Sequence, residues 1–271
     1  MLDFPNAKIN IGLNIIRKRP DGFHDIETAF YPIDFRDILE FVTNKKSVQT
    51  DIKTYGLPID ANVKDNLVYK AYELLADDFS LPPLGIALYK KIPFGAGLGG
   101  GSSDAAFMLK MLNSEFSLKL SEGELMNYAS KLGSDCAFFI KNRPVYAFER
   151  GDKFNALNLD LNGYYLMIII PEFKISTPQA YSKARPKSPT QDLKKSLQTP
   201  IEDWKDLISN DFEEVVFEYH PQAVQIKKLL YEAGAVYASL SGSGSAFYGI
   251  FREAPKSELF RQFVFSKLIK L

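Results

Sequence analysis

The sequence predicts an α+β fold, in which runs of helices lie beside antiparallel strands. Three observations predict it. Residues 8–15 alternate apolar and polar side chains, which is the period of a strand. The glycine-rich segment 93–104 leads into apolar residues at helical spacing, and residues 238–251 indicate a strand, a glycine turn and a second strand. Helical runs beside such strands are typical of α+β layers.

The first strand carries two polar residues on one face. Ile9, Ile11 and Leu13 alternate with polar positions, so Lys8 and Asn10 point to the same side. By itself this pattern favours a solvated polar face. A turn at 19–24, extended chain through residue 41, a helix at 66–76 and a strand at 84–89 follow.

The glycine-rich segment is the most informative part of the chain. Glycines leave the backbone free to adopt positive φ and let a ligand approach bare N–H groups. Apolar residues from 105 to 112 then recur at i, i+3, i+4 and i+7, and Ser102, Ser103 and Asp104 can each cap the helix that they predict. A glycine loop before a helix N-terminus is typical of a phosphate-binding site, so we expect a nucleotide triphosphate here, ahead of a purely structural turn.

Three common nucleotide-binding folds fit poorly. Gly95, Gly97 and Gly100 satisfy G-x-G-x-x-G, but a dinucleotide-binding fold continues directly to a strand. Here Ser121 and Glu124 indicate a capping box that begins a second helix, predicted through residue 132. No Lys-Ser or Lys-Thr pair closes the loop as in a P-loop, and the protein-kinase motifs His-Arg-Asp and Asp-Phe-Gly do not occur.

The rest of the chain gives weaker signals. Asp135 lies at a junction before residues 138–140, which indicate an aromatic strand, and it is as compatible with a turn or cap acid as with catalysis. A new unit is expected near residue 157, with a buried strand at 164–171 and an exposed loop at 182–199. Helices are predicted at 201–219 and 221–233, and an amphipathic helix at 256–270.

Composition limits the classes of function. The 33 basic and 33 acidic residues give a net charge of +0, so no global field recruits nucleic acid or an anionic membrane. One cysteine rules out an internal disulfide, and two histidines argue against a Cys/His zinc cluster. The N-terminus lacks a secretory pattern, and the longest apolar run, near Leu166–Ile170, is too short to span a bilayer. We therefore expect a soluble cytoplasmic protein with no obligate protein partner.

Several motifs together carry a family resemblance. The segment 93–106 resembles the ATP loop of the GHMP kinases. Residues 7–10, 21–24, 132–135 and 176–178 narrow the resemblance to the branch that acts on a cytidine diphosphate alcohol. It covers residues 7–251 and implies a two-domain GHMP kinase fold. An ATP-binding domain with a ribosomal-protein-like fold is expected at 1–156, and the C-terminal GHMP kinase domain at 157–271.

The resemblance implies a role for each matched position. Lys8 and Asp135 match the catalytic pair of the family. In that pair the aspartate accepts the proton of the substrate hydroxyl, and the lysine orients the aspartate. Mg²⁺ bridges the ATP phosphates without a carboxylate cage, and Ser102 and Ser103 stay equal candidates for a hydroxyl ligand. The ATP-binding positions are Pro93, Phe94, Gly95, Ala96, Gly97, Leu98, Gly99, Gly100, Gly101, Ser102 and Ser103.

On the substrate side, the resemblance implies that His24 contacts cytosine and that Phe23 and Tyr181 stack on it, with Asn10 and Thr177 nearby. Residues 241–244 match a late glycine motif near the active site. The sequence departs from the family pattern at Phe23, where tyrosine is frequent, and at residues 136–137, where Val-Pro is common. The alternative is another small-molecule GHMP kinase, acting on homoserine or mevalonate. A nucleic-acid-binding module is disfavoured, because it would need a basic patch with interleaved aromatic residues.

Overall fold

The computed structural model describes residues 1–43, 49–58 and 62–271. It divides into two compact units that are interleaved along the sequence. The first unit comprises Met1–Ala7, Phe35–Phe94 and Gly99–Arg143, and the second comprises Lys8–Asp34, Gly95–Leu98 and Pro144–Leu271. The predicted boundary between residues 156 and 157 concerns family domains and stays a prediction. Over the described ranges, no helix combines the length and the apolar character needed to cross a membrane.

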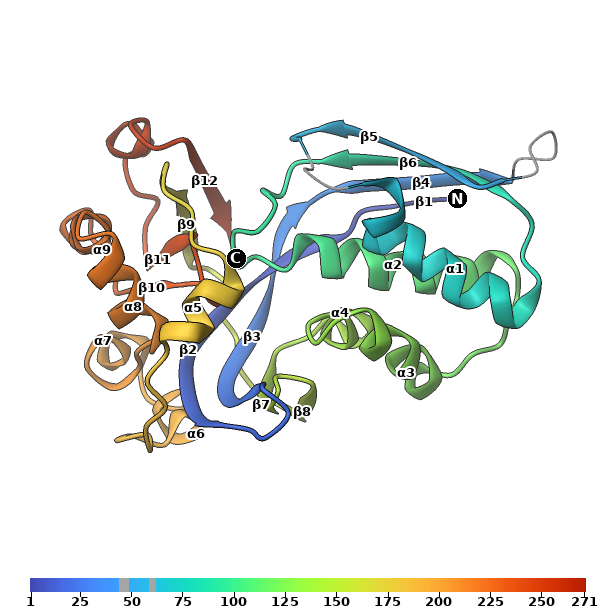
Figure 1. The fold of residues 1–271 in the computed structure, drawn as a ribbon. Coiled ribbons are helices and arrows are strands. Elements are labelled where there is room, and N and C mark those ends of the chain that lie inside the picture. The colour runs from blue at the N-terminus through green and yellow to red at the C-terminus, as the bar shows by residue number, and fades with distance from the viewer. Residues whose placement is uncertain (44–48, 59–61) are drawn as a thin grey trace. The chain divides into compact units, whose positions relative to one another are not determined.

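The first unit is one sheet with helices beside it. The strands lie in the order β1-β4-β6-β5, with β5 parallel to β6 and the other neighbours antiparallel. They are β1 Leu2–Asp3, β4 Ile38–Thr43, β5 Asp51–Gly56 and β6 Leu84–Lys90. The helices are η1 Val63–Asp65, α1 Leu67–Phe79, α2 Gly100–Glu115, α3 Glu122–Leu132 and α4 Cys136–Lys141. In Figure 1, α1 and α2 lie along one face of this sheet.

Local signals set the ends of two of these helices. Asn66 caps α1 by accepting a hydrogen bond from the N–H of Val68, at 2.9 Å. Ser121 and Glu124 form the predicted capping box at the start of α3. The apolar side chains of α2, among them Met108 and Leu109, are fully buried, as their helical spacing predicts.

The second unit contains two four-stranded sheets. One has the order β2-β3-β7-β8 and the other β10-β11-β9-β12. The strands of the first sheet, of which β2 and β3 lie mostly in this unit, are β2 Asn6–Lys18, β3 His24–Arg36, β7 Val145–Glu149 and β8 Lys153–Ala156. Those of the second sheet are β9 Tyr165–Ile170, β10 Tyr237–Leu240, β11 Phe247–Phe251 and β12 Phe265–Lys270.

The second unit also contains helices. They are α5 Thr177–Lys183, α6 Leu193–Ser196, η2 Ile201–Asp203, α7 Trp204–Leu207, α8 Phe212–Tyr219, α9 Ala223–Glu232 and η3 Ser257–Phe260. Helices α8 and α9 lie beside the sheet that contains β10 and β11 (Figure 1). Ile15, Ile169, Phe212, Leu230 and Phe247 belong to one buried apolar cluster, which joins β2 to the sheet and its helices.

The α+β fold is confirmed, whereas three local predictions are wrong. Residues 138–140 belong to helix α4, because so short an apolar run fits either period. The predicted helix 256–270 is a 3-10 turn followed by strand β12, which pairs antiparallel with β9. Strand β9 needs hydrogen-bond partners on both edges, and this pairing overrides local helical spacing. The third prediction, the exposed loop 182–199, is confirmed for residues 185–192 and wrong at 193–196, which form helix α6 with Leu193 buried.

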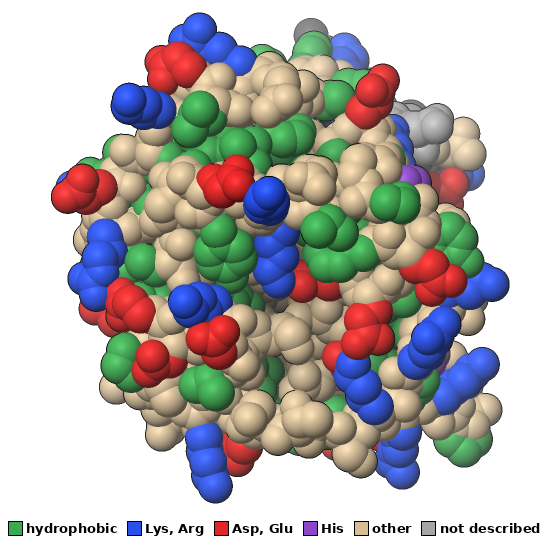
Figure 2. Space-filling view, turned by 90° about the vertical axis from the view of Figure 1, so that its left-hand side faces the viewer, with side chains coloured by type: hydrophobic (Ala, Val, Ile, Leu, Met, Phe, Trp, Pro, Cys, Tyr) green, Lys and Arg blue, Asp and Glu red, His purple; other side chains and the backbone are tan. Residues whose placement is uncertain are grey.

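One face of the molecule is drawn as a surface in Figure 2. Lysine and arginine side chains alternate there with aspartate and glutamate, and hydrophobic groups lie between them. Neither sign of charge gathers into a continuous area on this face. The surface shown therefore agrees with the balanced composition, which gives no single-sign field.

Candidate functional site

The glycine loop leaves strand β6 and ends at helix α2. Gly95, Gly97 and Gly99 adopt positive φ values of 69°, 80° and 70°. Gly99 is the N-cap, so the helix begins at Gly100 and contains Ser102, Ser103 and Asp104. The prediction that one of these three side chains caps the helix is therefore wrong, because a glycine in the left-handed region already starts the helix.

The first turn of α2 presents backbone donors. The N–H of Ser103 bonds to the carbonyl of Gly99, at 2.9 Å, as the first regular helical bond. The N–H groups of residues 100–102 precede it and have no acceptor within the helix. Together with the positive end of the helix dipole, they form the kind of donor set that binds a phosphate.

Within the second unit, the β10–β11 turn holds the segment Gly95–Leu98. The hydroxyl of Ser241 donates to the carbonyl of Gly97, at 2.9 Å, and accepts from the N–H of Asn10, at 3.2 Å. The N–H of Ala246 donates to the carbonyl of Ala96, at 3.0 Å. A Cβ atom on Gly97 would lie 2.0 Å from the carbonyl oxygen of Ser241. Gly97 is therefore required by close backbone approach as well as by its φ.

Lys8 and Asn10 lie together in the interior of the second unit. Each is only 2% exposed, so the interpretation of this strand face as solvated is wrong. The ammonium of Lys8 donates to Oδ1 of Asn10, and Nδ2 of Asn10 donates to the hydroxyl of Thr28, at 3.0 Å. The ammonium also lies 4.7 Å from the centre of the Phe30 ring. A buried lysine held by an amide and an aromatic ring is a candidate functional cation.

His24 lies in an aromatic stack in the same unit. It is 8% exposed, and its ring stacks on Tyr181 with centroids 5.1 Å apart. Tyr181 in turn meets Phe212 edge-on at 4.8 Å. Burial, together with the charge of Lys18, lowers the pKa of His24. The imidazole is therefore neutral at neutral pH, with one nitrogen that donates and one that accepts.

The two remaining substrate-side predictions lie at the edges of this unit. Phe23 is 54% exposed, and the guanidinium of Arg150 lies 5.4 Å from the centre of its ring. The hydroxyl of Thr177 lies 3.0 Å from that of Ser243, in the β10–β11 turn. Thr177 also begins α5, the helix that carries Tyr181. The structure thus connects Thr177 to two other predicted segments of the second unit.

Asp135 belongs to the first unit and is half-buried. It occupies the N-cap position of α4, but its side chain makes no capping hydrogen bond. Asp135 therefore lies in a turn at the helix start, as the structural interpretation expects, but its side chain does not cap the helix. Cys136 follows it in the interior, and burial raises the pKa of that thiol to about 12.

The first unit contains a buried ionic cluster that no sequence motif indicated. We define the Lys90 cluster as Lys90, Asp37 and Asp104, whose exposed fractions are 3%, 0% and 2%. The ammonium of Lys90 donates to both carboxylates, with 2.6 Å to Oδ2 of Asp104. Burial raises the pKa of Asp104, and Lys90 opposes that rise while Asp37 adds to it. Asp104 was considered in the sequence only as a cap of α2, and no pattern connected it to Lys90 or Asp37.

The structure also bears on the metal and on other hollows. Within the described parts of the chain, no group of three or more His, Cys, Asp or Glu side chains could hold a metal ion. Ser103 is fully buried whereas Ser102 is half-buried.

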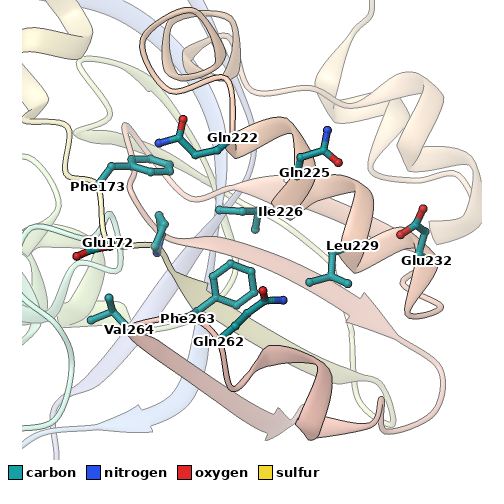
Figure 3. Close-up of a pocket in the computed structure, with 11 residues that line it drawn as sticks. Glu172, Phe173, Gln222, Gln225, Ile226, Leu229, Glu232, Gln262, Phe263 and Val264 are labelled. Carbon is teal, nitrogen blue, oxygen red and sulfur yellow. The ribbon is translucent and has the colours of Figure 1, made fainter.

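A hollow of the second unit lies against α9, with Phe173 and Ile226 among its lining residues (Figure 3). None of the predicted site residues lines it, so it contributes nothing to the predicted site.

Comparison with known proteins gives a consistent result. Residues 66–143 match the family of GHMP kinases N terminal domains, and residues 193–269 match the GHMP kinases C terminal family. The chain is 51% identical to the 4-diphosphocytidyl-2-C-methyl-D-erythritol kinase of Bacteroides thetaiotaomicron, over 93% of this chain and 92% of the relative. It is 45% identical to the kinase of the same name from Cytophaga hutchinsonii, over 95% and 94% of the two chains.

Solved structures agree with the sequence relatives. A crystal structure of 4-(cytidine 5'-diphospho)-2C-methyl-D-erythritol kinase aligns with a TM-score of 0.84 and 28% identity, and covers 99% of this chain and 98% of that one. A mevalonate kinase aligns over the same shares of the two chains with a TM-score of 0.70, but at 14% identity, which shows a shared fold alone.

Proposed function

Because the chain belongs to the GHMP kinase family, we propose that it transfers the γ-phosphoryl group of ATP to the 2-hydroxyl of 4-diphosphocytidyl-2-C-methyl-D-erythritol, in the non-mevalonate route to isoprenoid precursors. The observation that carries this proposal is the 51% identity, over nearly the whole chain, to a kinase of that name. The neutral, stacked His24 supports it, because a cytosine edge offers both donors and acceptors to an imidazole. The reacting molecules are ATP and the cytidine substrate, no protein partner is required, and we place the reaction in the cytoplasm.

Asp135 and Lys8 have the proposed chemical roles. The carboxylate of Asp135 takes the proton of the substrate hydroxyl while the hydroxyl oxygen attacks the γ-phosphorus of ATP. The bond between the γ-phosphorus and the bridging oxygen breaks, and ADP leaves. Phosphoryl transfer depends mainly on alignment and charge stabilisation, so one base and one cation suffice on the protein side. The position of Asp135 in the turn before α4 and the burial of Lys8 support these roles.

The glycine loop is the proposed ATP phosphate site. The N–H groups at the start of α2, the positive φ of Gly95, Gly97 and Gly99, and the lack of side chains there let phosphate oxygens approach the backbone. Mg²⁺ neutralises phosphate charge when it is bound, and ATP and water would supply most of its ligands. Of the two candidate hydroxyls, that of Ser102 fits better, because Ser103 is fully buried.

The cytidine side of the site is assigned to the second unit. His24 hydrogen-bonds the base, while Phe23 and Tyr181 offer rings for stacking. Asn10 and Thr177 contribute polar groups to the rest of the substrate. Phe23 lacks the phenol oxygen of a tyrosine but keeps the ring, so stacking is retained while one hydrogen bond is not available.

A turnover assay tests the reaction against its nearest alternative. ADP release is measured with the cytidine substrate, homoserine and mevalonate, each at the same concentration. We expect turnover with the cytidine substrate and little with the other two alcohols. Turnover with homoserine or mevalonate, together with none with the cytidine substrate, would contradict the proposal. The Gly99→Val variant tests the ATP loop separately, because its branched side chain occupies the space that phosphates need, so affinity for an ATP analogue falls.

A further inference from the structure

The Lys90 cluster connects the two ends of the glycine loop. Lys90 is the last residue of β6, shortly before the loop, and Asp104 is in α2, shortly after it. Their side chains meet at 2.6 Å in the interior of the first unit. The ion pair therefore joins the strand that precedes the loop to the helix that follows it.

Asp37 fixes the start of the loop through its other oxygen. Oδ1 accepts hydrogen bonds from the N–H groups of Lys91, at 2.6 Å, and Ile92, at 2.9 Å. These two residues lie directly before Pro93, where the loop begins. Asp37 itself is held between β3 and β4, where its N–H donates to the carbonyl of Pro5, at 2.9 Å. One carboxylate thus orients both the backbone before the loop and the ammonium of Lys90.

The start of helix α2 is packed closely onto this cluster. A Cβ atom added to Gly100 would lie 2.8 Å from Cγ2 of Ile92 and 3.3 Å from the ammonium of Lys90. The first helical residue therefore has no room for a side chain on this side. A shift of Lys90 or Ile92 would move the helix start, which carries the backbone donors of the loop.

Ion pairs are an unfavourable way to stabilise such a position. A buried pair loses hydration that its mutual attraction only partly restores, and apolar residues of similar volume often stabilise a core equally well. Oδ1 of Asp104 is moreover buried with no hydrogen-bond partner among the described residues, which apolar packing would avoid. What the charged groups provide is direction, because a hydrogen-bonded pair fixes both position and orientation.

We propose that Lys90, Asp37 and Asp104 are positioning residues that hold the glycine loop in the shape that receives the ATP phosphates. This inference rests on the proposed assignment of the loop as the phosphate site. None of the three residues needs to touch ATP, since they act through Lys91, Ile92 and the first turn of α2. They should therefore affect ATP affinity and leave the cytidine side unchanged.

The test uses the full chain with Lys90→Met and Asp104→Leu combined. This double variant removes both ion pairs of Lys90 and keeps most of the side-chain volume. Asp37 keeps its two backbone donors but loses its cation, so a lower unfolding midpoint is expected as well. The measurements are the Kd for a non-hydrolysable ATP analogue, the KM for each substrate and the thermal unfolding midpoint. We expect the Kd to rise by about tenfold to a hundredfold, because small misplacements of binding groups cause losses of that order. The KM for the cytidine substrate should stay within about twofold.

Two control variants separate positioning from stability. Lys141→Met removes a cation that pairs with Glu122 on the surface of the same unit, and it should leave both affinities unchanged. Leu125→Ala creates a cavity in α3, away from the loop, and it should lower the unfolding midpoint without a selective loss of ATP affinity.

The outcomes divide clearly. A folded double variant with wild-type ATP affinity would show that the Lys90 cluster only stabilises the core, and so would an equal rise in both KM values. If Lys90→Met/Asp104→Leu unfolds, the single variant Asp37→Asn provides the same comparison. It keeps an oxygen for Lys91 and Ile92 but turns an amide toward Lys90. If Gly99→Val also retained ATP affinity, the phosphate-site assignment itself would be wrong. If only Gly99→Val lost it, the inference about the cluster would fail alone.

Discussion

Replacement of Gly97 by alanine gives the sharpest test of the loop geometry. The added Cβ atom would lie 2.0 Å from the carbonyl oxygen of Ser241 and 3.3 Å from that of Gly244. Both contacts are with backbone, so no side-chain rotation relieves them. The β10–β11 turn must move, and its movement breaks the hydrogen bonds that the Ser241 hydroxyl makes with Gly97 and Asn10.

The magnitude follows from two contributions. An alanine at the φ of +80° found for Gly97 costs about 1–2 kcal/mol for its left-handed backbone. Each of the two lost hydrogen bonds costs about 0.5–1.5 kcal/mol. We therefore expect Gly97→Ala to lower the free energy of unfolding by about 2–5 kcal/mol.

Gly163→Ala is the matched control in the same unit. Gly163 has a φ of +90°, and a Cβ atom there would meet nothing within 4 Å. The substitution carries the same backbone penalty and the same change in unfolded-state entropy, so it should cost only about 1–2 kcal/mol.

Urea unfolding followed by tryptophan fluorescence measures both variants. The single tryptophan, Trp204, is buried in the second unit and reports on the part of the chain that contains both glycines. The difference between the two variants isolates the clash with Ser241. If Gly97→Ala were no more destabilising than Gly163→Ala, the close approach of the two backbones would be incorrect.

The remaining predictions concern the proposed chemistry and the buried thiol. Asp135→Asn should lower kcat by about 10²–10⁴-fold with ATP binding nearly unchanged, and near-normal turnover of the folded variant would assign Asp135 to a structural turn. Lys8→Met should also depress kcat. His24→Ala and Tyr181→Ala should each weaken binding of the cytidine substrate by about 1–3 kcal/mol. Calorimetric titration measures this affinity, and a second titration with an ATP analogue should show an unchanged affinity. Loss of ATP binding alone would reverse the assignment of the two sides. Cys136 should not react with a thiol reagent in the native protein at neutral pH, but should react once urea unfolds the chain, because burial raises its pKa from 9.0 to about 12. Between these two values the unfolded thiol loses a proton that the native one keeps, so this group's contribution to stability falls as pH rises through that window.

Elements whose signals are local were predictable from the sequence. The capping box of Ser121 and Glu124 forms between residues three positions apart, and the alternation at 8–15 predicted β2. The glycine loop and the helix that follows it were likewise evident from spacing. The roles of the substrate-side residues came from the family resemblance, and they stay predictions.

Only tertiary structure decided the burial of charges and the choice between helix and strand at the C-terminal end. Lys8 seemed solvated because alternation shows which residues share a face, but not whether another element covers that face. Residues 265–270 form a strand because β9 offers them an unpaired edge. Ser241, which limits Gly97, is 144 positions away from it. Local hydrogen bonds and periodicity act within a few residues, whereas packing and pairing depend on partners that no local pattern identifies.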